Sequence, residues 1–319
     1  MGETEERGQR QEPLVVLLLG PTGSGKTALS LALARQFAGE IVNCDSVAIY
    51  TGMDIGSAKP SREEQAEAPH HLIDVTTPDV EFTAGAYSRA ARAALAEITT
   101  RGRLPIVTGG TGLYLRALTM GLFAGPERDE ELRRRLTEAQ QKHGEGWLHR
   151  ILTRLDRTSA ERIHPNDVPK LIRAIEVSVK TGKPFSALID DQAEARDPLT
   201  GYRLLRVGLN PPRAALYERL NRRCAEIFAE GLIEETRGLY ERHGWVKPLD
   251  ALGYRQALGV IRGECSEAEA LEAAQQGHRN YAKRQLTWFR REPEVHWFES
   301  FGNSSATRDA VVELVRASL

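Results

Sequence analysis

The amino-acid sequence predicts an α/β fold, in which a parallel sheet core flanked by helices is interrupted by an all-helical insertion domain. Short apolar runs alternate with helical patterns in residues 13–125 and again in residues 201–319, and this alternation is typical of a parallel sheet. Residues 126–200 show helical patterns with no strand between them. We therefore expect one core domain formed by the two outer segments and one helical insertion, preceded by a disordered tail at residues 1–12.

The first strand is expected over the apolar run Leu14–Leu19, directly before the segment Gly20-Pro-Thr-Gly-Ser-Gly-Lys-Thr27. This segment matches the phosphate-loop pattern, and a helical pattern beginning near Lys26 completes the strand, loop and helix context that the motif requires. Its backbone amides would bind phosphates, and the Thr27 hydroxyl would bind Mg²⁺. We therefore expect a P-loop NTPase-like core, with diphosphate- or nucleotide-binding residues Gly20, Pro21, Thr22, Gly23, Ser24, Gly25, Lys26 and Thr27.

Three further strands are expected at residues 40–43, 71–75 and 104–108, and a helix at residues 83–100. Asp45-Ser46 and Gly110-Thr111 follow two of these strands. Because the carboxyl ends of parallel strands share one edge of a sheet, we expect these residues and the phosphate loop to face one cleft.

Helices dominate the rest of the chain. In the insertion, Thr158 and Glu161 form a capping-box pattern, and the apolar positions include Leu171, Ile175 and Val179. After it come a strand at residues 202–209, a helix with Pro212 in its first turn, a helix beginning at residues 253–256, a helix capped by Ser266 and Glu269, a strand at residues 295–298 and a terminal helix.

Composition narrows the class of protein. The chain has 319 residues, 41% hydrophobic and 27% charged, and a net charge of −1, so a nucleic-acid contact must come from local clustering of basic residues. Its three cysteines lie far apart and show no zinc spacing, which favours reduced thiols in a cytoplasmic protein. No apolar run is long enough for a signal peptide or a membrane span.

Asp45 allows three interpretations. It can bind Mg²⁺ as in a nucleotide hydrolase or kinase, act as a general base at the cleft mouth, or cap a turn. Asp74 also follows apolar residues and competes for the metal role. The segment Gly109-Gly110-Thr111 is either a set of phosphate-contacting amides with a hydroxyl or an ordinary turn.

Two helices carry clustered basic residues. The helix after Pro212 contains Arg213, Arg219, Arg222 and Arg223, of which each is either a ligand contact or solvated. Between Glu272 and Glu292 there is no acidic residue, while basic and aromatic residues interleave. On a helix, one face carries Arg284, Trp288 and Arg291, and another carries Ala282, Leu286 and Phe289. The first face suits single-stranded nucleic acid, and a solvated basic helix with core aromatics is the alternative.

Taken together, the motifs resemble those of the tRNA dimethylallyltransferase family, also called tRNA isopentenyltransferases. The resemblance covers nearly the whole chain, through the phosphate loop, Asp45–Tyr50, Gly52–Lys59, Gly109–Tyr114, Arg162–Asp167, Gly253–Gln256 and Lys283–Trp288. It implies transfer of a dimethylallyl group from dimethylallyl diphosphate to the exocyclic amine of the adenosine 3′-adjacent to the anticodon in tRNA, with release of diphosphate.

The resemblance also implies roles for individual residues. Asp45 would be the general base, Thr111 would lie beside the reacting centre, Arg223 would hold the diphosphate and Mg²⁺ would be the cofactor. The implied tRNA contacts, some of them in the helical insertion, are Asp45, Ser46, Val47, Ala48, Thr111, Arg133, Lys170, Arg173, Gly253, Tyr254, Arg255, Gln256, Lys283, Arg284, Gln285, Trp288 and Arg290. Lys170 stands where the family often has arginine, which keeps the charge and loses the planar two-pronged contact.

The alternative function is an ATP-dependent small-molecule kinase of the P-loop type, with Asp45 or Asp74 on magnesium. A GTPase is disfavoured because the guanine-reading sequence Asn-Lys-x-Asp is missing. We expect a monomer with no membrane partner.

Overall fold

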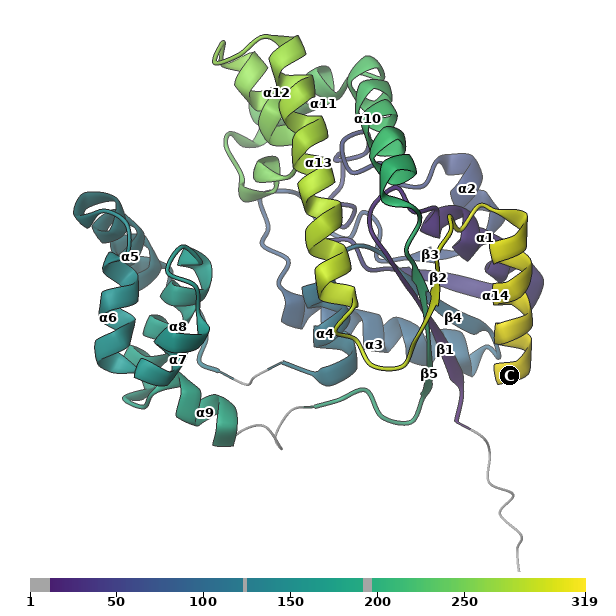
Figure 1. Cartoon of the computed structure of the whole chain (residues 1–319), viewed down its shortest axis with the longest axis horizontal. Coiled ribbons are helices and arrows are strands. Elements are labelled where there is room, and N and C mark those ends of the chain that lie inside the picture. The colour runs from purple at the N-terminus through teal and green to yellow at the C-terminus, as the bar shows by residue number, and fades with distance from the viewer. Residues whose placement is uncertain (1–11, 123–124, 192–196) are drawn as a thin grey trace, which may run out of the picture. The chain divides into compact units, whose positions relative to one another are not determined.

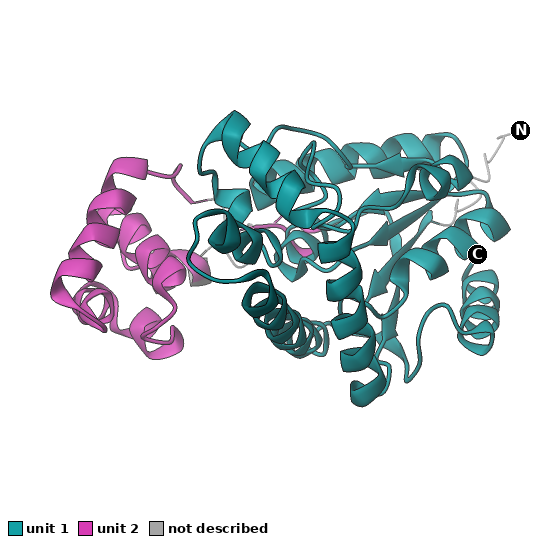
Figure 2. Cartoon of the chain, turned by 90° about the horizontal axis from the view of Figure 1, so that it is seen from above, with its two compact units in different colours: residues 1–119, 199–319 teal, residues 120–198 magenta. Residues whose placement is uncertain are grey.

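The computed structural model describes residues 12–122, 125–191 and 197–319, so most of the expected tail, residues 1–11, lies outside the described residues. The described chain divides into two compact units, shown in different colours in Figure 2. Unit 1 comprises the residues up to Thr119 and those from Leu199 onward, and unit 2 comprises Met120–Pro198. The first boundary thus lies several residues before the expected position at residue 126.

Unit 1 is built on a parallel sheet, as predicted (Figure 1). Within the described residues its strands lie in the order β3-β2-β4-β1-β5-β6, and every pairing is parallel. The strands are β1 (Leu14–Leu19), β2 (Gly39–Asn43), β3 (His70–His71), β4 (Leu104–Thr108), β5 (Arg203–Leu209) and β6 (Val295–Phe298). The central strand β1 is therefore followed by the phosphate loop in the middle of the sheet.

Helices cover both faces of this sheet (Figure 1). Side chains of β1 alternate, with Val16 and Leu18 in one apolar cluster and Val15 and Leu17 in another. The first cluster includes residues of α1 (Lys26–Phe37) and α14 (Ser305–Ser318), and the second includes residues of α3 (Ala84–Thr100) and α4 (Gly112–Met120). A strand covered on both faces needs apolar side chains in both directions, which explains its unbroken apolar run.

The strand expected at residues 71–75 is wrong beyond its first residue, since β3 spans only His70–His71. Leu72 and Asp74 have φ angles of 62° and 54°, so the backbone leaves the extended conformation there. The side-chain Nδ2 atom of Asn43 donates to the carbonyl of Leu72 at 2.8 Å and holds this irregular segment beside β2.

The second half of unit 1 is mainly helical. A third apolar cluster joins helices from this half to Ile49, Tyr50 and Met53 of the segment after β2. Ser266 and Glu269 form the predicted capping box at the start of α13, while Pro212 lies just before its helix rather than inside it. The remaining elements of unit 1 are α2 (Arg62–Glu67), α10 (Arg213–Ala229), α11 (Leu232–His243), η1 (Lys247–Asp250), α12 (Tyr254–Ile261) and α13 (Glu267–Phe289).

Unit 2 contains helices α5 (Glu130–His143), α6 (Trp147–Leu155), α7 (Arg157–Arg162), α8 (Val168–Thr181) and α9 (Phe185–Asp191). They share an apolar core that includes Leu148, Leu152 and Leu171. The capping box expected at Thr158 is wrong, because Asp156 caps α7 by accepting from the amide of Ser159 at 3.0 Å.

Val179, expected on the apolar face of α8, is instead 55% exposed. Across the described part of the chain, no helix combines the length and apolar character needed to cross a membrane.

Candidate active site

A cavity of about 800 Å³ lies in unit 1 at the carboxyl ends of β1, β2 and β4. Thr22, Gly23 and Gly25–Thr27 of the phosphate loop line it together with Asp45, Ser46 and Gly110, which confirms the predicted shared cleft for these residues, whereas Thr111 does not line it. Basic and polar residues of α10 and α13 form part of its wall: Arg219, Arg222, Arg223, His278, Tyr281, Arg284 and Gln285. The cavity therefore combines an anion-binding loop with cations and carboxylates, among which Asp45 follows β2 directly.

The phosphate loop has the backbone that glycine permits. Gly20, Gly23 and Gly25 have φ angles of 145°, 76° and 90°, and a Cβ atom at Gly20 would lie 2.8 Å from the carbonyl oxygen of Leu209. The Nζ atom of Lys26 donates to the carbonyls of Gly20 and Pro21 at 2.8 and 2.7 Å. Burial lowers the pKa of Lys26 to about 7, against the opposing charge of Asp45. A bound anion would restore the cationic form of this lysine.

Asp45 does cap a turn, and it does so with one oxygen. Its Oδ1 atom accepts from the amides of Val47 and Ala48 at 2.8 and 3.4 Å. These are the hydrogen bonds that its carboxylate accepts from the described part of the chain, and they leave Oδ2 available to a ligand. The turn interpretation and a chemical role for Asp45 are therefore compatible.

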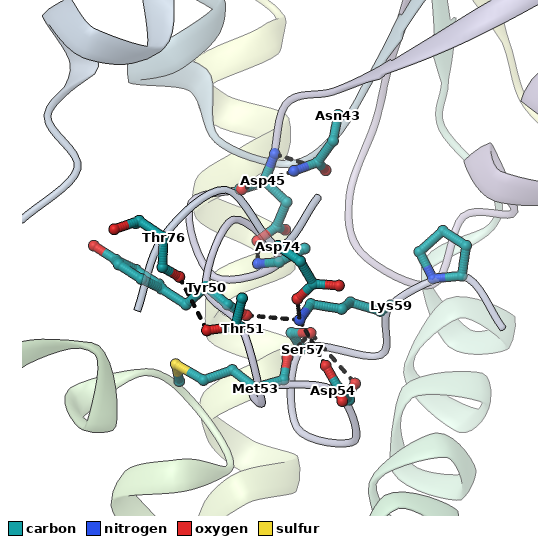
Figure 3. Close-up of polar contacts among 12 residues, drawn as sticks. Asn43, Asp45, Tyr50, Thr51, Met53, Asp54, Ser57, Lys59, Asp74 and Thr76 are labelled. Atoms are coloured by element: carbon teal, nitrogen blue, oxygen red, sulfur yellow. Dashed lines mark hydrogen bonds and ion pairs between the residues drawn. The ribbon is translucent and has the colours of Figure 1, made fainter. Parts of the chain in front are cut away.

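Asp74 forms an ion pair with Lys59 (Figure 3). Its Oδ1 atom accepts from Nζ of Lys59 at 2.5 Å. The Lys59 side chain is only 5% exposed, and it also donates to Asp54 Oδ1 and to the carbonyl of Tyr50, both at 2.6 Å. Asp74 does not line the cavity, whereas Asp45 does, so Asp45 is the aspartate of the two that is placed to reach a ligand there.

Thr111 joins two of the loops at the sheet edge. Its Oγ1 atom accepts from the amide of Ser46 at 3.0 Å and donates to the Ser46 hydroxyl at 3.2 Å, and its own amide donates to the carbonyl of Cys44 at 3.1 Å. The segment is thus a turn whose hydroxyl fixes the chain next to Asp45.

The four arginines of α10 separate by position. Arg219, Arg222 and Arg223 line the cavity, whereas Arg213 stacks over the ring of Tyr217. Burial and the charge of Arg219 lower the pKa of Arg223, and the charge of Asp45 opposes this shift. Such a buried cation is stabilised when an anion enters.

His278 of α13 was missed by sequence reasoning. It lines the cavity, and burial together with the charge of Arg223 lowers its pKa to about 4, so the ring is neutral at neutral pH. The sequence did contain a signal for this position: His278 lies seven residues before Gln285, which is two helical turns along the same face of a helix.

Helix α13 presents the expected cations but turns other residues inward. Lys283, Arg284 and Arg290 are exposed, while Trp288 is partly buried against the apolar cluster that covers one face of the sheet. Gln285, implied as a tRNA contact, is only 4% exposed, and both ends of its amide bind backbone atoms within unit 1. In this structure it is an internal contact rather than a surface one.

Two other implied tRNA contacts, in the segment Gly253–Gln256, are engaged inside unit 1. Tyr254 is fully buried, and its hydroxyl donates to Glu235 Oε1 at 2.6 Å. The Oε1 atom of Gln256 accepts from the amide of Gly253 at 2.9 Å and caps α12. Arg255 is exposed and is the residue of this segment best placed for a partner.

In unit 2, Arg133 and Arg173 converge on one buried carboxylate. Glu176 has a fully buried side chain and accepts from Arg133 at 2.8 and 3.1 Å and from Arg173 at 2.6 Å. Lys170 is exposed and pairs with Asp167 at 2.5 Å. Of these three implied tRNA contacts, Lys170 is therefore the one outside a buried ion-pair cluster.

The residues around the phosphate loop fit a magnesium ion that also binds a phosphate group. No group of three or more His, Cys, Asp or Glu side chains in the described residues is arranged to hold a metal ion by itself. Mg²⁺ commonly uses one or two protein oxygens and completes its shell with water and substrate phosphates. Thr27 lines the cavity, and its hydroxyl supplies one such oxygen.

Comparison with known proteins identifies the family of this chain. A family model described as IPP transferase matches residues 48–292. The chain is 58% identical over 308 residues to a tRNA dimethylallyltransferase of Koribacter versatilis, covering 96% of this chain and 99% of that protein. It is 52% identical over 304 residues to a tRNA dimethylallyltransferase of Solibacter usitatus, covering 94% and 97%.

Solved structures agree with these relatives. A tRNA isopentenylpyrophosphate transferase of Bacillus halodurans is 36% identical, has a TM-score of 0.70, and the match covers 96% of both chains. The fold is also similar to that of a eukaryotic dimethylallyltransferase acting on tRNA, with a TM-score of 0.74 at 24% identity. With a phosphate loop, a carboxylate and buried cations around one cavity, and with relatives that match over nearly its whole length, the chain belongs to the IPP transferase family.

Proposed function

We propose that this protein transfers a dimethylallyl group from dimethylallyl diphosphate to the exocyclic amine of the adenosine 3′-adjacent to the anticodon in tRNA, and releases diphosphate. The observation that carries the proposal is the single cavity lined by Lys26, Asp45 and Arg223. The names of the relatives support the tRNA substrate and the reaction class. The comparisons give no support to the alternative of an ATP-dependent kinase.

The phosphate loop would bind the diphosphate of the donor. Its amides, the ammonium of Lys26 and the guanidinium of Arg223 provide positive charge where the leaving group gains negative charge. When the carbon–oxygen bond of the allylic carbon breaks, its electron pair goes to the departing diphosphate. Burial lowers the pKa of both side chains, so the negative charge of the diphosphate would stabilise their cationic forms.

Asp45 would remove the proton of the attacking amine. The amine nitrogen forms the new bond to the allylic carbon, and Oδ2 of Asp45 accepts the proton that the nitrogen loses. The hydrogen bonds from Val47 and Ala48 to Oδ1 fix the orientation of the carboxylate. The contacts from Thr111 to Ser46 hold the same loop from its other side.

Mg²⁺ would be held by the Thr27 hydroxyl together with the diphosphate and water, which leaves Oδ2 of Asp45 free to accept the proton. When bound, it would neutralise charge on the diphosphate.

The tRNA would contact exposed cations of both units. Lys283 and Arg284 lie on α13, Arg290 follows its last residue, Arg255 lies on α12 and Lys170 lies on α8. Arg284 also stacks over the ring of Tyr281, whose edge lines the cavity. An unstacked adenosine would enter beside these residues, since a base inside a helix cannot reach a buried donor. We propose that the enzyme acts as a monomer in the cytoplasm, where tRNA is modified.

The decisive assay supplies labelled dimethylallyl diphosphate, unmodified tRNA and Mg²⁺ without ATP. We expect label in the tRNA together with release of diphosphate. A parallel reaction supplies γ-labelled ATP and small-molecule acceptors in place of the prenyl donor. Phosphate transfer in that reaction, with no label in tRNA in the first, would favour the kinase and contradict the proposal.

A further inference from the structure

Gln285 is a buried polar residue of α13 that lines the cavity together with its neighbour Arg284. It is 4% exposed, while its neighbours Lys283 and Arg284 on α13 are exposed. A buried amide is costly unless both of its polar atoms find partners. An apolar residue of similar size would fill the same space, so packing alone does not account for a glutamine here.

Both atoms of the Gln285 amide bind backbone groups of functional loops. Its Oε1 atom accepts from the amide of Thr22 in the phosphate loop at 2.8 Å. Its Nε2 atom donates to the carbonyl of Gly110, after β4, at 2.9 Å. One side chain of α13 therefore joins two loops that lie far from it in the sequence.

The surrounding contacts make this connection tight. A Cβ atom at position 110 would lie 2.2 Å from Nε2 of Gln285, so the approach requires glycine. The hydroxyl of Tyr281, one turn earlier on α13, lies 3.4 Å from the same Gly110 carbonyl. The next residue, Thr111, binds Ser46 beside Asp45. A continuous set of contacts thus runs from α13 to the phosphate loop and to the loop that carries Asp45.

We propose that Gln285 is a positioning residue that couples RNA docking on the exposed face of α13 to the arrangement of the phosphate loop. The proposal rests on the proposed function. RNA bound at Lys283 and Arg284 fixes the position of α13, and α13 fixes Thr22 and Gly110 through Gln285. Because coupling between two binding sites is reciprocal, RNA strengthens diphosphate binding and diphosphate strengthens RNA binding by the same factor.

The test compares Gln285→Met with Gln276→Met. Methionine keeps the length of the side chain and removes both hydrogen bonds. Gln276 lies on the same helix and is exposed, and its side-chain amide bonds to Asn280 and Arg279 of the same helix in the described structure, so it is a matched control. The dissociation constant of inorganic pyrophosphate with Mg²⁺ is measured with and without a saturating anticodon stem-loop RNA.

In the unaltered protein and in Gln276→Met, we expect the RNA to tighten pyrophosphate binding by about five-fold or more. In Gln285→Met the factor falls below about two-fold, and Gln285→Asn, which is one methylene short, loses it as well. A wild-type factor in Gln285→Met, or no coupling in the unaltered protein, overturns the inference.

Hydrogen exchange of the unaltered protein tests the inference even if the variants fold poorly. The Thr22 amide donates to Gln285, so RNA should slow its hydrogen exchange, and unchanged exchange overturns the inference. The labelled-donor assay separates this failure from that of the proposed function. A protein that transfers label but shows no coupling refutes only the role of Gln285, whereas one that transfers no label refutes the function itself.

Discussion

At the residue scale, the cavity brings the carboxylate of Asp45 together with the cations of Lys26 and Arg223. Lys26 and Arg223 both have pKa values lowered by burial, and Asp45 is the acidic group that opposes both shifts. His278 stays neutral beside Arg223 because its own pKa falls to about 4. This arrangement favours a ligand with high negative charge, and the amides of Val47 and Ala48 orient Asp45 through Oδ1, so that Oδ2 accepts no hydrogen bond from the described residues.

Asp45→Asn is predicted to lose transfer while keeping the structure of the turn. The asparagine carbonyl can still accept from the amide of Val47, but the amide group cannot accept a proton from the attacking amine. We expect turnover to fall by about 10²–10⁴-fold with tRNA affinity nearly unchanged, measured by single-turnover transfer and filter binding. Asp74→Asn is the matched control and should retain most activity. Near-normal turnover in Asp45→Asn would remove Asp45 as the base.

Glu176→Gln is predicted to destabilise unit 2. Burial alone would raise the pKa of Glu176, but hydrogen bonds from Arg133, the amide of Asp129 and Arg173 lower it to about 2. Breaking such a buried cluster costs about 3–5 kcal/mol, whereas Glu138→Gln removes an exposed pair worth at most about 1 kcal/mol. Thermal unfolding of the full chain measures both.

The same cluster predicts a pH dependence. Because the folded pKa of Glu176 is below its ordinary value of 4.5, its stabilisation is complete above pH 4.5 and is lost as the pH falls toward about 2. Glu176→Gln should weaken the acid destabilisation in this window. Equal acid sensitivity of the variant and the unaltered protein would contradict the ion-pair account.

At the element scale, α13 separates two tasks on two faces. Exposed cations lie on one face, while Ala282, Gln285 and Phe289 are buried on the other. The sequence predicted this division for Ala282 and Phe289 because apolar spacing is a local pattern. It did not predict the role of Gln285, whose partner Thr22 lies 263 residues away and is brought near only by the tertiary fold.

Other elements show the same limit. The strands that coincide with apolar runs and the glycine-rich loop were predictable, since both depend on local sequence. The end of β3 was not, because the positive φ angles of Leu72 and Asp74 depend on tertiary contacts such as that from Asn43. Arg133 and Arg173 were expected at a surface, but a buried glutamate one helical turn from Arg173 draws both inward.

Replacing Lys283 and Arg284 with alanine is predicted to weaken tRNA binding. Each phosphate contact contributes about 0.9 to the slope of log affinity against log salt for duplex and about 0.7 for single strands, so the double variant should lose up to about two slope units. The control replaces Arg308 and Arg316, two exposed arginines of α14, with alanine. Equal salt dependence in the two variants would mean that α13 is only structural.

At the scale of the whole molecule, unit 1 supplies every residue that lines the cavity, although its two segments are separated in sequence by unit 2. Unit 2 has its own apolar core, which includes Leu148 and Leu152. The residues of the proposed chemistry therefore lie within one unit, and the role that we propose for unit 2 is to contact the tRNA.

The central claim is that a phosphate loop here holds a prenyl donor while Asp45 serves an adenosine acceptor in the same cavity. The most direct measurement is nucleoside-resolved mass spectrometry of unmodified tRNA incubated with the protein, dimethylallyl diphosphate and Mg²⁺ in the absence of ATP. We predict a dimethylallyl group on the adenosine 3′-adjacent to the anticodon, dependent on Asp45. Unmodified tRNA, or a prenyl group at another position that persists in Asp45→Asn, would contradict it.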